Sequence, residues 1–160
     1  IVEKIRPTQV TLVPDSPNQA TSDHGWDVQT HRDYLTRTIA QLHSWGCRTA
    51  IFLDYNNPHL ETVLQTGTDR VELYTEPYAR AHESNTHHDM LRTFQQTAST
   101  LHAQGIGINA GHDLTLDNLP DFANALSDSL LEVSIGHALT VDALHLGWSE
   151  SVKRYVACLG

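Results

Sequence analysis

The stretch "DRVELYTEPYARAHESNTHHDMLRTFQQTASTLHAQGIGINA", residues 69–110, decides the fold. It begins with "DRVELYT" (69–75) and ends with "GIGINA" (105–110), two short apolar runs of the kind that predicts β-strands. Between them, the apolar residues of "DMLRTFQQTASTLHAQG" (89–105) recur three and four positions apart, which predicts a helix. Strand, helix and strand in this order form a βαβ unit, whose two strands lie parallel in one sheet.

The same alternation extends over the whole chain. Further strands are expected at 8–13, 48–53 and 130–136, and further helices at 31–45, 58–65, 118–126 and 141–159. Five βα units predict an α/β domain, with a parallel sheet and right-handed crossovers. The residues alone allow either an open doubly wound sheet or an arc of an eight-stranded barrel. In both architectures, functional residues gather at the carboxyl ends of the strands.

Composition narrows the class of protein. The 160 residues are 39% hydrophobic and 18% charged, which is typical of one soluble domain covering 1–160. The net charge of -9 argues against a nucleic-acid or membrane partner, because the ten Lys and Arg residues form no basic stripe. No signal peptide or membrane-spanning segment is visible. Two distant cysteines favour a reducing, cytoplasmic setting, and the start at Ile1 leads us to expect a fragment.

Glu72 is an unusual residue for the middle of a buried strand. Alternation along "VELYT" places Val71 and Leu73 on one face, and Glu72 with Tyr74 on the other. A buried carboxylate is costly unless it is paired. Glu72 therefore either forms a structural ion pair with an interior Arg or Lys, or is a functional carboxylate that stabilises positive charge or moves a proton.

The next two strands both end in Gly-His. In "INAGHD" the small residues before His112 permit a tight turn, which leaves this histidine at the strand end, where it could act as an acid or base. In "SIGHAL" Gly136 and His137 stand where a helix begins, and amide groups at a helix N-terminus bind phosphate. The two strand ends together predict an acid–base site with a phosphate pocket beside it.

Two polar stretches allow both a functional and a plain interpretation. The segment 13–28 is long for a βα loop, which favours a lid or ligand loop containing Thr21 over a solvated connection. His82, His87 and His88 superficially suggest a metal cluster, but their spacing matches no familiar ligand motif. We interpret these histidines as a solvated surface and expect no metal site.

Four motifs, in their order and spacing, resemble the pyridoxine 5′-phosphate synthase family over essentially the whole chain. They are "VTLVPDSPNQATSDHGWDV" (10–28), "VELYTEPYA" (71–79), "INAGHDLT" (108–115) and "SIGHAL" (134–139). The resemblance implies a TIM-type (β/α)8 barrel, of which the five units are strands four to eight. It also implies condensation of 1-deoxy-D-xylulose 5-phosphate with 3-amino-2-oxopropyl phosphate to pyridoxine 5′-phosphate, phosphate and water. The family uses no metal or organic cofactor, and the resemblance suggests a homo-oligomer.

The resemblance also assigns roles to individual residues. His112 matches the family's proton donor, and Glu72 matches its carboxylate that stabilises the transition state. The matching substrate-binding positions are Thr21, Asp113, Gly136 and His137. Two departures from the family motifs affect the substrate fit. Asp113 follows His112 where many members have Gly, and its carboxylate would repel a phosphate unless it is turned away. Glu76-Pro77 stands where other members have smaller residues.

The family's first three strands, which carry further functional residues, have no counterpart in these 160 residues. We therefore expect this chain alone to be inactive and its parent protein to be active. Two alternatives stay open: a non-catalytic, phosphate-binding remnant of the barrel, and another sugar-phosphate barrel enzyme that uses Glu72 as base and His112 as electrophile.

Overall fold

The computed structural model describes residues 1–19 and 21–160. One sheet contains the strands β1 (Gln9–Leu12), β2 (Arg48–Asp54), β3 (Arg70–Tyr74), β4 (Gly107–Gly111) and β5 (Leu130–Ser134). All neighbouring strands are parallel, and their order is β1-β2-β3-β4-β5. The parallel sheet predicted from the alternating pattern is confirmed.

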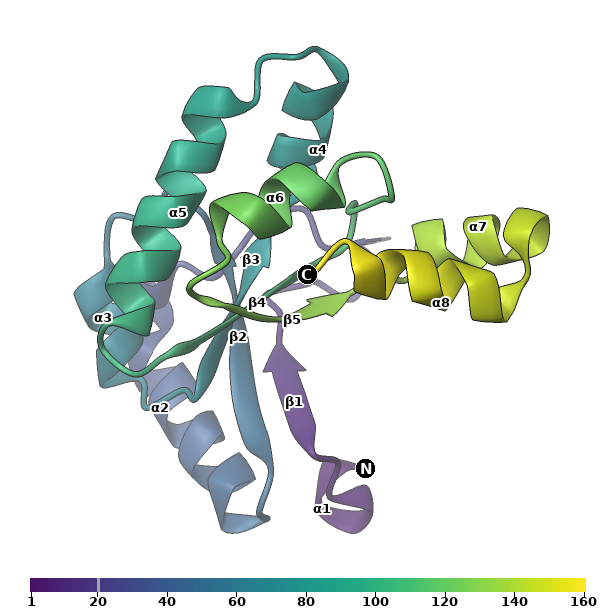
Figure 1. Cartoon of the computed structure of the whole chain (residues 1–160). Helices are drawn as coiled ribbons and strands as arrows, with labels where there is room; N and C mark the ends of the chain where they lie inside the picture. The colour runs from purple at the N-terminus through teal and green to yellow at the C-terminus, as the bar shows by residue number, and fades with distance from the viewer. Residues whose placement is uncertain (20) are drawn as a thin grey trace.

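The helices follow the strands as expected for repeated βα units. They are α1 (Val2–Ile5), α2 (Val28–Ser44), α3 (Leu60–Gln65), α4 (Glu76–Glu83), α5 (His88–His102), α6 (Leu119–Ala125), α7 (His137–Leu146) and α8 (Trp148–Ala157). Helices α2, α3 and α5 lie along the same side of the sheet, whereas α7 and α8 pack together as a pair beyond β5 (Figure 1).

The sequential strand order decides between the two architectures. A doubly wound sheet changes direction at a switch point, so its strands are not in chain order. Here every strand pairs with the next one along the chain, as in a (β/α)8 barrel. The chain is therefore an arc of five βα units of a TIM-type barrel. Among the described residues, β1 and β5 each pair on one side only.

Alternation along the strands separates an apolar face from a polar one. Val71, Leu73 and Ile108 are fully buried and belong to the hydrophobic core. On the opposite face of the sheet, the register aligns Glu72 with Asn109 of β4. The core is completed by fully buried side chains from the helices, including Leu35, Ile39, Tyr78, Phe94, Leu101 and Phe122. Apolar burial thus fixes which face of the sheet carries the polar side chains.

The helices differ from the prediction in three places, one of which is the short helix α1, which was not predicted. The expected helix at 141–159 is two helices, because Gly147 adopts a positive φ of 83° between α7 and α8. Such a backbone conformation suits glycine and interrupts a helix. Helix α4 was not predicted, although Pro77 in its first turn is a common helix-start signal. No helix in the ranges 1–19 and 21–160 has the length and hydrophobicity needed to cross a membrane.

Candidate active site

The six predicted site residues come together at one cavity. A cavity of about 670 Å³ lies at the carboxyl ends of β3, β4 and β5 and is also bordered by Ser134 and Ile135. The predicted residues that line it are Thr21, Glu72, His112, Asp113, Gly136 and His137. Segments far apart in the sequence therefore build one site, as the parallel sheet requires.

His112 follows β4 directly and is held by three contacts. Its backbone φ of 61° is left-handed, which is unusual for a residue other than glycine. The backbone N–H donates to the Ser134 carbonyl oxygen at 3.2 Å. The ring Nε2 lies 3.0 Å from the Thr21 hydroxyl, and Nδ1 lies 2.9 Å from Oδ2 of Asp113. Strained backbone that is held by its surroundings is a common feature of functional sites.

Asp113 is turned toward His112 rather than left free in the cavity. Its carboxylate accepts from Nδ1–H of His112, which orients the imidazole and leaves Nε2 on the side of Thr21. The same arrangement of hydroxyl, imidazole and carboxylate orients catalytic histidines in other enzymes. The repulsion that Asp113 would exert on a phosphate is thus reduced by the histidine beside it.

Glu72 reaches the cavity from the middle of β3. Burial raises the pKa of its carboxyl group, while a hydrogen bond from the Thr11 hydroxyl at 3.2 Å and the nearby charge of His112 act in the opposite direction. The only side chain that donates to Glu72 among the described residues is Thr11, a partner that the sequence motifs did not indicate. Among the described residues, Glu72 forms no ion pair with Lys or Arg.

The interior ion pair considered for Glu72 forms on a different strand. Glu132 of β5 accepts from Arg48 at 2.7 Å and also contacts Arg70. Arg70 donates to the Asn109 side chain at 2.8 Å. These polar side chains join β2, β3, β4 and β5 across the polar face of the sheet. Glu132 thus shares its single negative charge between Arg48 and Arg70, and among the described residues neither arginine pairs with Glu72.

Thr21 belongs to the long loop after β1, which is anchored on β2. The Trp26 amide donates to the Phe52 carbonyl at 2.9 Å, and the Trp26 indole donates to the Leu12 carbonyl at 2.9 Å. The Gly25 amide donates to the Asp54 carboxylate at 3.1 Å. The loop is thus attached at its end to the rim of the sheet, and its contact with His112 agrees with the ligand-loop interpretation.

A second cavity of about 690 Å³ adjoins the first and shares His112, Asp113 and His137 with it. It extends along α4, where it is lined by Glu76, Arg80 and His82. Glu76, one of the two departures from the family motifs, forms an ion pair with Arg80 within this helix. Glu76 therefore lines the second cavity and does not line the first.

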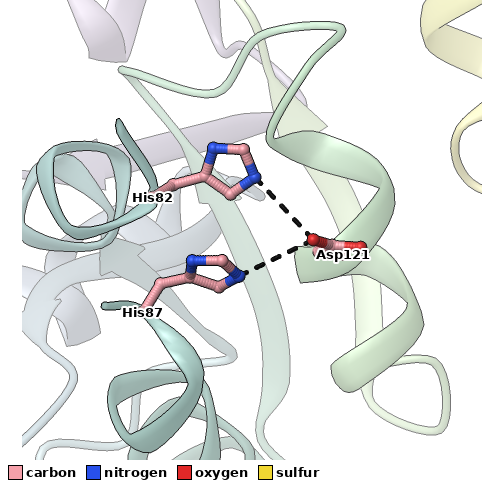
Figure 2. A group of neighbouring side chains, drawn as sticks. All are labelled: His82, His87 and Asp121. Atoms are coloured by element: carbon pink, nitrogen blue, oxygen red, sulfur yellow. Dashed lines mark ion pairs between the residues drawn. The ribbon is translucent and has the colours of Figure 1, made fainter. Parts of the chain in front are cut away.

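The interpretation of His82, His87 and His88 as a solvated surface is wrong for His87. His88 is exposed, but only 4% of His87 is accessible to solvent. His82 and His87 both face Asp121 of α6 (Figure 2). Asp121 lies more than thirty residues beyond the polar run that contains the histidines, so the local spacing of ligands does not reveal this group.

Comparison with known proteins identifies the family. A family model described as "Pyridoxal phosphate biosynthesis protein PdxJ" matches residues 1–160. Relatives named pyridoxine 5′-phosphate synthase include one from Porphyromonas gingivalis, 51% identical over 97% of this chain and 64% of its own length. The relative from Allorhizobium ampelinum is 46% identical over 100% of this chain and 65% of its own length. The relative from Albidiferax ferrireducens is 47% identical over 99% of this chain and 63% of its own length.

The chain thus spans slightly less than two thirds of the length of these relatives. Five consecutive βα units in barrel order agree with such a share of an eight-unit barrel. With a family match over its whole length and about half of its residues identical to those of the first relative, the chain belongs to the family of the pyridoxal phosphate biosynthesis protein PdxJ.

Proposed function

We propose that the protein carrying this chain is a pyridoxine 5′-phosphate synthase. It would condense 1-deoxy-D-xylulose 5-phosphate with 3-amino-2-oxopropyl phosphate to give pyridoxine 5′-phosphate, phosphate and water. The observation that carries the proposal is the single cavity lined by all six residues that the family motifs indicate. The relatives that share the name of this enzyme support it.

His112 is the proposed general acid. Loss of water from a condensation intermediate requires a proton on the departing oxygen, and imidazole supplies such a proton near neutral pH. Asp113 accepts from Nδ1–H, so the acid has to be the imidazolium form, which carries a second proton on Nε2; that proton is directed to the side of the cavity where Thr21 lies. Before substrate binds, the Thr21 hydroxyl would position Nε2 by a hydrogen bond. After binding, the hydroxyl and Nε2 would each form a hydrogen bond with the substrate instead.

Glu72 is the proposed stabiliser of positive charge. The condensation of an amine with a ketone passes through an iminium ion, and a carboxylate in a half-buried site stabilises this cation more than water does. Burial raises the pKa of Glu72 in the free protein. A cationic intermediate next to it would favour the ionised form, so the interaction strengthens as the charge develops.

The start of α7 is the proposed phosphate site. Gly136 and His137 line the cavity at the N-terminus of this helix, where amide groups without intrahelical acceptors favour an anion. Gly136 adds no side chain to this wall, and an ideal Cβ built on it would meet no atom within 4 Å. A phosphate oxygen could therefore approach the backbone directly.

The whole protein is proposed to be a cytoplasmic homo-oligomer in which residues 1–160 form the last five βα units of one barrel domain. The exposed apolar side chains of the α7–α8 pair support self-association: Leu144 is 82% exposed and Trp148 63%. The two free cysteines agree with a reducing compartment. The lengths of the relatives support the domain assignment.

The test is turnover by the complete protein. Purified protein is incubated with both substrates, and pyridoxine 5′-phosphate is followed by absorbance while released phosphate is measured in parallel. The proposal predicts equal amounts of both products, and none when either substrate is omitted. A folded protein that binds pyridoxine 5′-phosphate without turnover would instead be the non-catalytic remnant, and conversion of one sugar phosphate alone would indicate an isomerase.

A further inference from the structure

Three potential metal ligands from three helical segments converge beside the second cavity. His82 lies in the last turn of α4, His87 directly precedes α5, and Asp121 lies in the first turn of α6. Nε2 of each histidine is 3.7 Å from the same Asp121 oxygen, Oδ2, and the two ring centroids are 4.6 Å apart (Figure 2). Both imidazoles and the carboxylate thus point to one place.

His87 has no hydrogen-bond partner that would explain its burial. Its side chain is 5% exposed, and neither Nδ1 nor Nε2 has a hydrogen-bond partner among the described residues. An unpaired buried polar group is costly. A neutral imidazole offers a free nitrogen lone pair to a metal ion. A bound ion would therefore give the buried His87 ring the partner that no hydrogen bond supplies.

The distances suit a bridging ion better than direct hydrogen bonds. A separation of 3.7 Å between nitrogen and oxygen is longer than the usual hydrogen-bond range of about 2.7–3.2 Å. Ligand atoms of a tetrahedral zinc site lie about 3.3 Å apart, because each is about 2.0–2.2 Å from the metal. The three ligand atoms here all lie within 4.8 Å of one another. The two distances to Asp121 need to shorten by about 0.4 Å, which the exposed Asp121 side chain permits, and the two imidazole nitrogens by at most about 1.5 Å, which rotation of the partly exposed His82 ring permits.

Tyr78 packs against both histidine rings. It is fully buried, and its ring centroid lies 5.8 Å from those of both His82 and His87. The Tyr78 hydroxyl donates to the Asn118 carbonyl at 2.6 Å, which ties α4 to the segment preceding Asp121. The ligand positions are therefore held by packing around a rigid aromatic side chain, as a binding site needs.

We propose that His82, His87 and Asp121 bind one divalent transition-metal ion. Two imidazoles with one carboxylate favour ions such as Zn²⁺, Fe²⁺ or Co²⁺, whereas Mg²⁺ and Ca²⁺ prefer oxygen ligands. Three protein ligands leave at least one coordination position for water or an anion. Because His82 lines the second cavity, that position would face the space shared with His112. The ion would also join α4, α5 and α6.

Zinc binding to the complete protein tests this proposal without any substrate. The protein is purified without a histidine tag, treated with chelator and titrated with Zn²⁺ by calorimetry. The proposal predicts one ion per chain and a rise in melting temperature on Zn²⁺ addition. Asp121→Asn, at an exposed position, and His82→Ala should each weaken binding at least about tenfold. The matched controls Asp128→Asn and His102→Ala, also at exposed positions, should bind as the wild type does.

Co²⁺ provides a second readout, because visible absorption bands report its coordination. These bands should appear with the wild type and both controls, and be lost in Asp121→Asn and His82→Ala. Absence of stoichiometric Zn²⁺ binding would overturn the proposal. Binding that both ligand variants retain at wild-type affinity would overturn it too, because the ion would then lie elsewhere. Neither result bears on turnover, so the proposed enzymatic function is tested separately.

Discussion

Glu72 shows how one residue can serve activity at the expense of stability. Because burial raises the pKa of its carboxyl group, folding favours the protonated form. The stability that this residue contributes is fully present below the pKa of an unfolded glutamate and is lost as the pH rises through the folded-state pKa. At neutral pH an ionised Glu72 therefore weakens the fold.

We predict that Glu72→Gln raises the melting temperature at pH 7 to 8, and that this gain disappears below about pH 4, where the wild-type carboxyl becomes protonated in both states. For a chain of this size, each kcal/mol corresponds to about 2–4 °C. Turnover should fall by about 10²–10³ because the charge that stabilises the iminium ion is removed. Melting curves over this pH range check the prediction; a variant less stable than the wild type at pH 7 would refute it.

The contact between Thr21 and His112 leads to a second prediction at this scale. The Thr21 hydroxyl lies 3.0 Å from Nε2 of His112. Thr21→Val keeps the shape and removes the hydroxyl, so kcat should fall about tenfold, the equivalent of one hydrogen bond. Thr21→Ser is the matched control and should retain most of the activity. Equal rates for the valine and serine variants would show that the hydroxyl has no role.

At the scale of elements, β4 and β5 approach each other closely at Gly111. A Cβ on Gly111 would lie 2.6 Å from the Ser134 carbonyl oxygen, which also accepts the His112 amide. Gly111→Ala must therefore push the two strands apart, and we predict a loss of about 1–3 kcal/mol in the free energy of unfolding. Gly136→Ala, which would meet no neighbouring atom within 4 Å, is the control. Denaturant unfolding measures both, and equal stability of the two variants would contradict this account.

How far the sequence predicts the elements depends on whether the pattern is local. All five strands were predicted within a few residues because each is a short apolar run. The six residues that line the first cavity were also indicated by the sequence, some by their place at strand ends and the others by the family motifs; their roles stay predictions. The break at Gly147 was overlooked because apolar spacing continues across it. The group of His82, His87 and Asp121 depends on α6 packing beside α4 and α5, which no local pattern encodes.

At the scale of the molecule, the two outer strands of the sheet bear most on whether the 160-residue chain is active alone. Among the described residues, β1 and β5 each have one unpaired side, and barrels normally close these edges. We predict that the purified 160-residue chain forms no pyridoxine 5′-phosphate by itself, whereas the complete protein does. A turnover assay of both at equal concentration checks this. Product from the isolated chain at a rate near that of the complete protein would contradict it.

The charge of the molecule agrees with a small-molecule enzyme. A net charge of -9 gives no extended surface for polyanions, so the phosphate binding that we propose at the start of α7 is local and directional. His112 and Asp113 line the same cavity as Gly136 and His137 at that helix start.

The most direct test of the central claim is the turnover of His112→Ala in the complete protein, with His102→Ala as the control for an exposed histidine. The account predicts that kcat for pyridoxine 5′-phosphate formation falls about 10²–10⁴-fold in His112→Ala and is unchanged in His102→Ala. A folded His112→Ala protein that keeps kcat within a few-fold of the wild type would contradict the assignment of His112 as the acid, and with it the proposed site.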